Sequence, residues 1–318
     1  MNAPLISVVI ATRGRAPELE RCLLALSAQT VASADFEVVV CDDGSDEPIA
    51  GALAPVLAEV RGKVGVRLMR QDHSGPAVAR NRGAAVAAGR WLAFTDDDCS
   101  PAPDWLERLL ARFAASPDAL IGGGLCTPSD AAPCDRATQQ IMDFVYHEQE
   151  RRGGMRLFST SNLAISADAF HRLGGFSPAF GGPGGEDYDL CARWQARGGA
   201  VVNAPEARVV HEHGLTLVSY CRQHFGYGRG LVRMRSRLRQ QGVDVKEARR
   251  QSRPLNAVYY LRLVAAPWRA RGVRGTSSVV LIALAQAATA LGGLREAVRR
   301  VRGPASRRAP DAQAESNV

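Results

Sequence analysis

The first hundred residues alternate short apolar runs with amphipathic segments, and this pattern restricts the fold more than any other feature. Four runs rich in β-branched and aromatic residues predict buried strands, at 5–11, 36–41, 64–70 and 91–95. Three stretches between them have helical spacing, at 17–29, 46–60 and 74–88. Strands and helices that alternate in this way form βαβ units. The sequence therefore predicts an α/β fold with a mostly parallel sheet flanked by helices.

Farther along the chain this regular alternation weakens. Residues 159–200 are rich in glycine, and we expect irregular structure there apart from a helix over 187–197. A short strand is expected at 207–210, and only helices are expected from residue 215 onward.

Polar residues follow the predicted strands at the points where each strand ends. Thr12 and Arg13 come after the first strand, Asp42 and Asp43 end the second, and Asp96–Asp98 follow the fourth. Open α/β sheets bind their ligands at the carboxyl ends of the strands. We therefore expect a ligand site at this edge of the sheet, although the Asp-Gly step after Asp43 is also typical of a simple turn.

The three consecutive aspartates indicate a binding site for a cation. Adjacent carboxylates repel one another unless a positive charge lies nearby. Alternate residues of an extended chain point to the same side, so Asp96 and Asp98 could face one ion. Carboxylate oxygens are hard ligands that suit Mg²⁺ or Mn²⁺. The alternative is that these aspartates cap the helix that follows Pro103.

Three later clusters carry further chemistry-bearing side chains. Gly75 and Arg80 lie at the start of a predicted helix, which favours an anionic ligand. A glycine-rich stretch leads into Glu186 and Asp187, and a carboxylate there could act as a general base. His211 and His213 share one side of an extended chain and could reach a metal or a phosphate. Each cluster also has a structural alternative. The first could be an ordinary helix cap, the acidic pair could stabilise the first turn of a helix, and the histidines could be structural.

The charge is distributed unevenly along the chain. Residues 1–221 carry 20 basic and 27 acidic side chains, whereas residues 222–309 carry 20 basic and 3 acidic ones. A basic segment of this kind is attracted to polyanions, meaning anionic lipid headgroups or nucleic acid, and the alternative is a solvated helix face. The uncharged stretch 275–294 is flanked by arginines, which favours helices lying at a membrane surface. A bilayer span, soluble packing and a contact between two copies are the alternatives.

The cysteines and the N-terminus bear on the compartment. Seven cysteines without a C-x-x-C pair argue against a disulfide framework and a structural zinc site, and they fit a reducing compartment. The first residues lack a basic segment followed by an apolar one, so we expect no signal peptide. These features predict a location at the cytoplasmic face of the cell membrane.

Taken together and in order, the motifs resemble those of glycosyltransferase family 2, the nucleotide-sugar enzymes with the GT-A fold. The resemblance runs from residue 7 to about residue 230. It rests on eight short motifs, which are V-V-I-A-T-R-G-R (8–15), C-D-D-G-S (41–45), G-P-A-V-A-R-N-R-G (75–83), F-T-D-D-D (94–98), P-D-W-L (103–106), S-N-L-A (161–164), G-G-F (174–176) and G-E-D-Y-D-L-C-A-R (185–193).

The resemblance implies a role for each matching residue. The nucleotide-sugar donor would be bound by one set of residues, namely Thr12, Arg13, Asp42, Asp43, Gly75, Arg80, Asp96 and Asp97. Mn²⁺ or Mg²⁺ would be held by Asp96, Asp98 and one of His211 and His213. Asp187 matches the acidic base of the family, with Asn162 and Glu186 on the acceptor side. Attack of an acceptor hydroxyl opposite the leaving diphosphate would invert the anomeric carbon.

We accordingly predict a GT-A domain over 1–230, with a nucleotide-binding half (1–100) and an acceptor half (101–230). A basic, helical, membrane-associating extension over 231–302 and a disordered tail over 303–318 would follow. The predicted activity is inverting, metal-dependent transfer of a sugar to a hydroxyl of a lipid-linked or cell-envelope glycan acceptor.

Two alternatives stay open, namely a non-catalytic binder of nucleotide sugars or polyanions and a nucleotidyltransferase of related fold. Neither G-x-G-x-x-G nor a P-loop is present, which argues against dehydrogenases and P-loop enzymes. No nucleic-acid partner is expected, and a homo-oligomer is left open.

Overall fold

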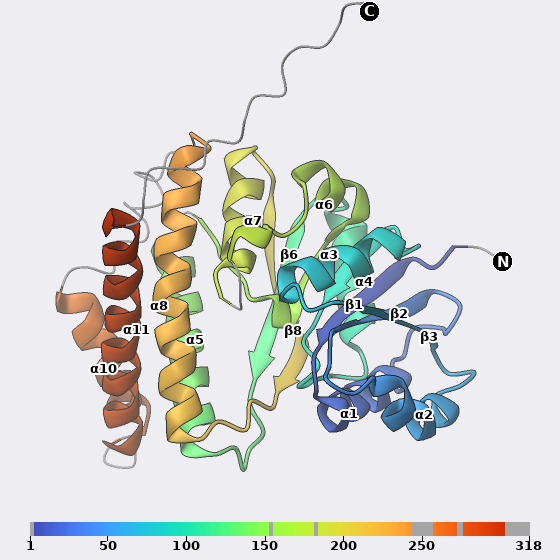
Figure 1. Cartoon of the computed structure of the whole chain (residues 1–318), viewed down its shortest axis with the longest axis horizontal. Coiled ribbons are helices and arrows are strands. Elements are labelled where there is room, and N and C mark those ends of the chain that lie inside the picture. The colour runs from blue at the N-terminus through green and yellow to red at the C-terminus, as the bar shows by residue number, and fades with distance from the viewer. Residues whose placement is uncertain (1–2, 153–154, 181–183, 243–256, 272–275, 303–318) are drawn as a thin grey trace, which may run out of the picture.

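The computed structural model describes residues 3–152, 155–180, 184–242, 257–271 and 276–302. A mixed sheet of eight strands forms the centre, and helices cover both of its faces (Figure 1). A group of long C-terminal helices lies along one side of this body. The predicted α/β fold with a helical C-terminal region is therefore confirmed.

The sheet has a parallel half and a mixed half. The strands are β1 (Ile6–Thr12), β2 (Phe36–Asp43), β3 (Gly65–Gln71), β4 (Trp91–Phe94), β5 (Cys99–Pro101), β6 (Leu120–Cys126), β7 (Leu163–Ser166) and β8 (Val201–His211). Their order in the sheet is β3-β2-β1-β4-β7-β6-β8-β5. Strands β1 to β4 run parallel, whereas β7 is antiparallel to both β4 and β6. The carboxyl ends of β1, β2 and β4 therefore meet at one edge.

Alternate residues of the central strands supply two separate cores. Val8 and Ile10 face helices α1 (Ala16–Ser27), α2 (Ile49–Glu59) and α4 (Trp105–Ala115), whereas Val9 faces the opposite layer. That layer contains α3 (Pro76–Val86), α6 (Ala167–Leu173) and α7 (Glu186–Ala196). Because both faces are covered, these strands carry apolar side chains on both sides, as is usual for parallel strands.

The glycine-rich region 159–200 is more regular than the sequence predicts. It contains the short 3-10 helices η1 (Thr160–Asn162) and η2 (Pro178–Phe180), strand β7 and helix α6 in addition to the expected α7. Ser166 caps α6 by accepting a hydrogen bond from the Ala169 N–H, and Gly174 ends it with a φ of 82°. Strand β7 has only four residues, too few for a clear alternating pattern, and its position depends on pairing with distant strands.

Four longer helices form the C-terminal side of the molecule, namely α5 (Pro133–Arg152), α8 (Leu217–Gln240), α10 (Ala257–Arg271) and α11 (Thr276–Arg302). Glycines bring the backbones of α8 and α11 close together. A Cβ at Gly228 would lie 1.9 Å from the Thr289 carbonyl oxygen, and a Cβ at Gly292 would lie 2.0 Å from that of Phe225. The predicted domain boundary at residue 230 falls inside α8, and the predicted tail over 303–318 lies outside the described residues.

The outer side of α11 is apolar and exposed. Six large side chains recur there at spacings of three, four or seven residues and are between 38% and 86% exposed, namely Val280, Leu284, Leu291, Leu294, Val298 and Val301. We call this set the α11 stripe. Among the described helices, α11 is the one long and apolar enough to cross a membrane by length and composition, over Ser277–Arg302.

Candidate active site

A cavity of about 840 Å³ opens where β1, β2 and β4 end. Its lining contains most of the predicted site residues, namely Thr12, Arg13, Asp43, Arg80, Asp96, Asp97, Asp98, Glu186, Asp187, His211 and His213. Asp42, Gly75 and Asn162 do not line it. Residues far apart in the sequence thus converge on one cavity, and their roles there stay predictions.

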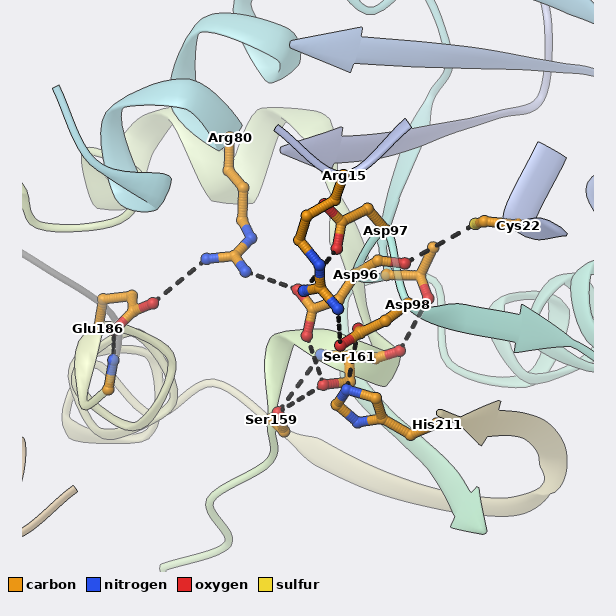
Figure 2. Close-up of polar contacts among 12 residues, drawn as sticks. Arg15, Cys22, Arg80, Asp96, Asp97, Asp98, Ser159, Ser161, Glu186 and His211 are labelled. Atoms are coloured by element: carbon orange, nitrogen blue, oxygen red, sulfur yellow. Dashed lines mark hydrogen bonds and ion pairs between the residues drawn. The ribbon is translucent and has the colours of Figure 1, made fainter. Parts of the chain in front are cut away.

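Arg80 joins the acidic residue after β4 to the first residue of α7. Its Nη2 lies 2.6 Å from Asp96 Oδ1, and its Nη1 lies 3.2 Å from Glu186 Oε1 (Figure 2). Ser161 Oγ donates to the other Asp96 oxygen at 2.6 Å. Burial raises the pKa of Asp96, but Arg80, His211 and the Ser161 hydrogen bond together outweigh burial and leave that pKa below its ordinary value.

Arg15 and His211 hold the other two aspartates. Arg15 Nη2 donates to Asp98 Oδ2 at 2.8 Å, and Arg15 Nη1 lies 3.0 Å from Asp97 Oδ1. His211 Nε2 lies 3.0 Å from Asp98 Oδ1. Burial opposes ionisation of Asp98, yet His211 and Arg15 keep its pKa well below the ordinary value. Burial raises the pKa of Asp97 to about 7 in spite of Arg15.

The two histidines occupy different positions. Strand β8 ends at His211, and His213 lies two residues beyond it with its ring on the same side. The imidazole rings stack with their centroids 3.6 Å apart, and only His211 contacts Asp98. Burial opposes the charged form of His211, but Asp98 outweighs burial and raises its pKa. Burial and the neighbouring His211 lower the pKa of His213 to about 3. The geometry favours His211 as the histidine beside a metal.

The donor set of this cluster fits a hard divalent cation. Ligand atoms of Asp96, Asp98, Cys99 and His211 lie within 4.8 Å of one another. Burial raises the pKa of the Cys99 thiol well above its ordinary value, so the carboxylates and the imidazole are the natural donors. Oxygen and nitrogen donors of this kind suit Mn²⁺ or Mg²⁺.

Asp187 lies in the first turn of α7 and faces the same cavity as the acidic cluster. Its Oδ1 accepts a hydrogen bond from the Tyr188 N–H at 2.8 Å. Burial and the negative charge of Glu186 raise the pKa of Asp187 to about 7. A carboxyl group with this pKa is suited to accept a proton near neutral pH.

Comparison with protein families identifies the chain. The model described as "Glycosyl transferase family 2" matches residues 7–174, and that of "Glycosyl transferase family group 2" matches residues 91–292. The chain belongs to glycosyltransferase family 2. The resemblance of its motifs to this family is therefore confirmed.

Similar proteins act on varied molecules. Validoxylamine A glucosyltransferase of Streptomyces hygroscopicus subsp. jinggangensis is 34% identical over 226 residues, covering 62% of this chain and 53% of that protein. The succinoglycan biosynthesis protein ExoM of Rhizobium meliloti is 31% identical over 222 residues, covering 67% and 70% of the two chains. The chain spans about half the length of the first curated relatives that it matches.

Solved structures show the same architecture. The mannosyltransferase PcManGT from Pyrobaculum calidifontis, in complex with GDP-Man and Mn²⁺, superposes with a TM-score of 0.65 at 19% identity. The match covers 95% of this chain and 88% of that chain. GalNAc-T7 with UDP, GalNAc and Mn²⁺ superposes with a TM-score of 0.51 over 66% of this chain and 43% of that chain, also at 19% identity. The predicted GT-A fold is confirmed.

Three residues predicted from the family motifs have structural partners instead of a place in the cavity lining. Asp42 accepts hydrogen bonds from Ser45 and pairs with Arg70. Asn162 donates to the carbonyl oxygens of Gly124 and Ala207 and accepts from Trp105 Nε1, which ties β6, β8 and α4 together. The Gly75 N–H donates to Asp43 at the start of α3.

Asp43 lines the cavity, but both of its oxygens already have partners. Oδ1 accepts from Gln71 Nε2 and the Ser74 N–H, and Oδ2 accepts from the Gly75 N–H and lies 2.9 Å from His73 Nδ1. Burial raises the pKa of Asp43, but these hydrogen bonds outweigh burial and lower it. Asp43 thereby fixes the loop between β3 and α3.

The family motifs contain two contact residues to which the sequence assigns no role. Arg15 ends the motif at 8–15 and holds Asp97 and Asp98, while Ser161 begins the motif at 161–164 and donates to Asp96. Their positions in the motifs were the only indication in the sequence that these two residues belong to the site. Their partners, which are 65 residues or more away in the sequence, could not be read from it.

Proposed function

We propose that this chain is an inverting, metal-dependent glycosyltransferase that moves a sugar from a nucleotide-diphosphate donor to an acceptor hydroxyl. The observation that carries the proposal is the convergence of Asp96, Asp98 and His211 with Asp187 on one cavity. Nucleotide-sugar transfer is the chemistry of the family to which the chain belongs. Two structurally similar glycosyltransferases are in complex with Mn²⁺ and a nucleotide or nucleotide sugar, which supports the donor class and the metal.

Asp96, Asp98 and His211 would hold the divalent cation. Such an ion supplies charge that stabilises a leaving diphosphate. Arg15 and Arg80 orient the two carboxylates, because each guanidinium contacts one of them directly. Arg80 also contacts Glu186, and so it links the donor side of the cavity to the start of α7.

Asp187 would take the proton from the acceptor hydroxyl as that oxygen attacks the anomeric carbon. Its raised pKa matches a base that works near neutral pH. Attack from the side opposite the diphosphate inverts the sugar carbon in a single displacement. Thr12, Arg13 and Asp43 line the cavity and would contact the nucleotide, as the family motifs imply.

We further propose that the enzyme works at the cytoplasmic face of the membrane on a lipid-linked or envelope glycan acceptor. The α11 stripe presents apolar side chains to solvent, and exposed arginines lie beside them at Arg295, Arg299 and Arg302. Apolar side chains flanked by arginines favour an interface with anionic lipid. Two copies that met through α11 in a parallel arrangement would bring these arginines together, and their repulsion disfavours that arrangement.

The substitution Asp187→Asn tests the assignment of the base. A panel of nucleotide sugars with Mn²⁺ first identifies the donor by the nucleotide that it releases. We expect Asp187→Asn to bind this donor as the wild type does and to lose transfer, because the amide cannot accept the proton. Arg82→Lys, on the exposed side of α3, is the matched control. Transfer near the wild-type rate in Asp187→Asn would remove Asp187 from this role.

A further inference from the structure

The cavity continues beyond Asp187 into an arm lined by residues of four helices, α5, α8, α10 and α11. We call this part the helical arm. Tyr227 on α8 connects it to the acidic site, since a Cβ at Gly184, three residues before Asp187, would lie 3.2 Å from the Tyr227 ring. Burial and the negative charge of Asp187 raise the pKa of Tyr227, as expected for neighbouring groups. The arm therefore begins beside the proposed base.

One side of the helical arm carries an apolar patch, beside the polar Gln139, Glu148 and Gln149 of α5. Met142 and Val145 lie one turn apart on α5, and Tyr259 and Leu263 lie one turn apart on α10. Tyr259 packs edge-on against Phe144 with the ring centroids 5.3 Å apart, which fixes α10 against α5. Unbranched methionine adapts its shape to varied apolar groups. This patch offers contact area to a hydrocarbon chain, and its aliphatic side chains offer no hydrogen bonds to a sugar.

Another part of the lining, on α8, holds two buried polar atoms without a hydrogen-bond partner among the described residues. These atoms are Gln223 Oε1 and His224 Nε2, and both residues line the cavity. His224 is 4% exposed, and its ring lies edge-on to Tyr220 and to Tyr227. Burial lowers the pKa of His224 to about 4, so its imidazole is neutral near pH 7. Buried polar atoms are rarely left unpaired in a folded protein, which points to a ligand that supplies the missing hydrogen bonds.

We propose that the helical arm is the acceptor site and that it takes an amphipathic alcohol. The hydroxyl-bearing head lies beside Gln223 and His224 and reaches Asp187, while the apolar chain lies against Met142, Val145 and Leu263. This inference rests on the proposed function, because it names the acceptor class of the same site. Helices α10 and α11 also carry exposed apolar side chains on their outer sides, at Leu261 and along the α11 stripe, so the arm and the proposed lipid-facing surface share two helices.

A binding measurement tests the apolar patch without any donor. The neutral fluorophore N-phenyl-1-naphthylamine should bind the wild-type protein and be displaced by 1-decanol in solution. Val145→Glu should weaken this binding roughly tenfold, because it places a charge inside the arm. His147→Glu is the matched control, since His147 is exposed on α5 and does not line the cavity. Leu291→Glu controls for dye on the α11 stripe, and both control variants should bind the dye as the wild type does.

An activity measurement tests the polar atoms of α8. The donor is the one found in the nucleotide-sugar screen. The acceptors are 1-decanol in solution and 1-octadecanol in phosphatidylcholine vesicles, so that a soluble acceptor is distinguished from one in a membrane. His224→Phe keeps an aromatic ring between Tyr220 and Tyr227 but removes Nε2. We expect the KM for the alcohol to rise about fivefold, because the loss of one hydrogen bond weakens binding by about this factor. The kcat and the affinity for the donor should stay unchanged.

Two results would overturn the inference. One is equal dye binding by Val145→Glu and the wild type. The other concerns myo-inositol, a polyol without an apolar chain. The inference fails if the rate of sugar transfer to myo-inositol equals the rate of transfer to 1-decanol and Val145→Glu does not change it. Failure of the proposed function looks different, because no nucleotide sugar would then be turned over while the dye still bound in the arm.

Discussion

Replacing Gly228 by alanine tests whether α11 is held against α8 by close backbone contact. A Cβ at this position would lie 1.9 Å from the Thr289 carbonyl oxygen, whereas ordinary contacts begin at 3.4 Å. The two helices would have to separate locally by about 1.5 Å, and overpacking of this kind costs about 1–3 kcal/mol. Alanine also favours a helix over glycine by about 1 kcal/mol, which would partly conceal the effect.

Gly226→Ala supplies the control, because it makes the same change in helix propensity on the same helix. A Cβ at Gly226 meets nothing within 4 Å. We expect Gly228→Ala to be less stable than Gly226→Ala by about 1–3 kcal/mol, with a melting temperature lower by about 2–4 °C for each kcal/mol. Thermal melting followed by circular dichroism in one detergent measures the difference. A Gly228→Ala protein that melts at or above Gly226→Ala would refute the close-contact account.

Three other predictions concern charged groups. Arg80→Lys cannot span its two carboxylate partners as a guanidinium does, so kcat/KM for the donor should fall about 10–100-fold, while Arg82→Lys stays at the wild-type value. Because the pKa of Asp187 is raised to about 7, the base becomes protonated on acidification, and kcat/KM should fall about tenfold from pH 8 to pH 6; a flat profile would contradict this. Burial opposes ionisation of Glu296, but arginines of α8 and α11 outweigh it and lower its pKa to about 2. Its carboxylate therefore stabilises the fold above about pH 4.5 and loses this effect as the pH falls towards 2. Glu296→Gln should be less stable than the wild type at pH 7 in urea titrations and equal to it near pH 2.

The strand ends could be predicted from sequence because an apolar run followed by a carboxylate is a local signal. Asp96 and Asp98 lie where that signal places them, at the edge of the sheet. Asp42 and Asp43, the adjacent pair at the end of β2, show the limit of this local signal. Neighbouring residues of a strand point to opposite sides, and only Asp43 of this pair reaches the cavity, while Asp42 pairs with Arg70.

Other features depend on contacts that local patterns do not record. Asp98 pairs with Arg15, 83 residues earlier, and Asp96 accepts from Ser161, 65 residues later. The two rings of His211 and His213 lie together on one side, as predicted, but the sequence does not show which of them contacts Asp98. A role for His224 could not be predicted from the sequence, because a single histidine within a basic helix resembles any solvated residue until its burial is known.

The hydrogen bonds of Asp43 bear on how tightly a donor could bind. The loop between β3 and α3 is fastened to this carboxylate through Ser74 and Gly75 with no ligand present. A donor that lies against this loop would not have to order it, so the conformational entropy lost on association would be smaller. Asp43 could thus contribute to affinity by preorganisation, without touching the nucleotide.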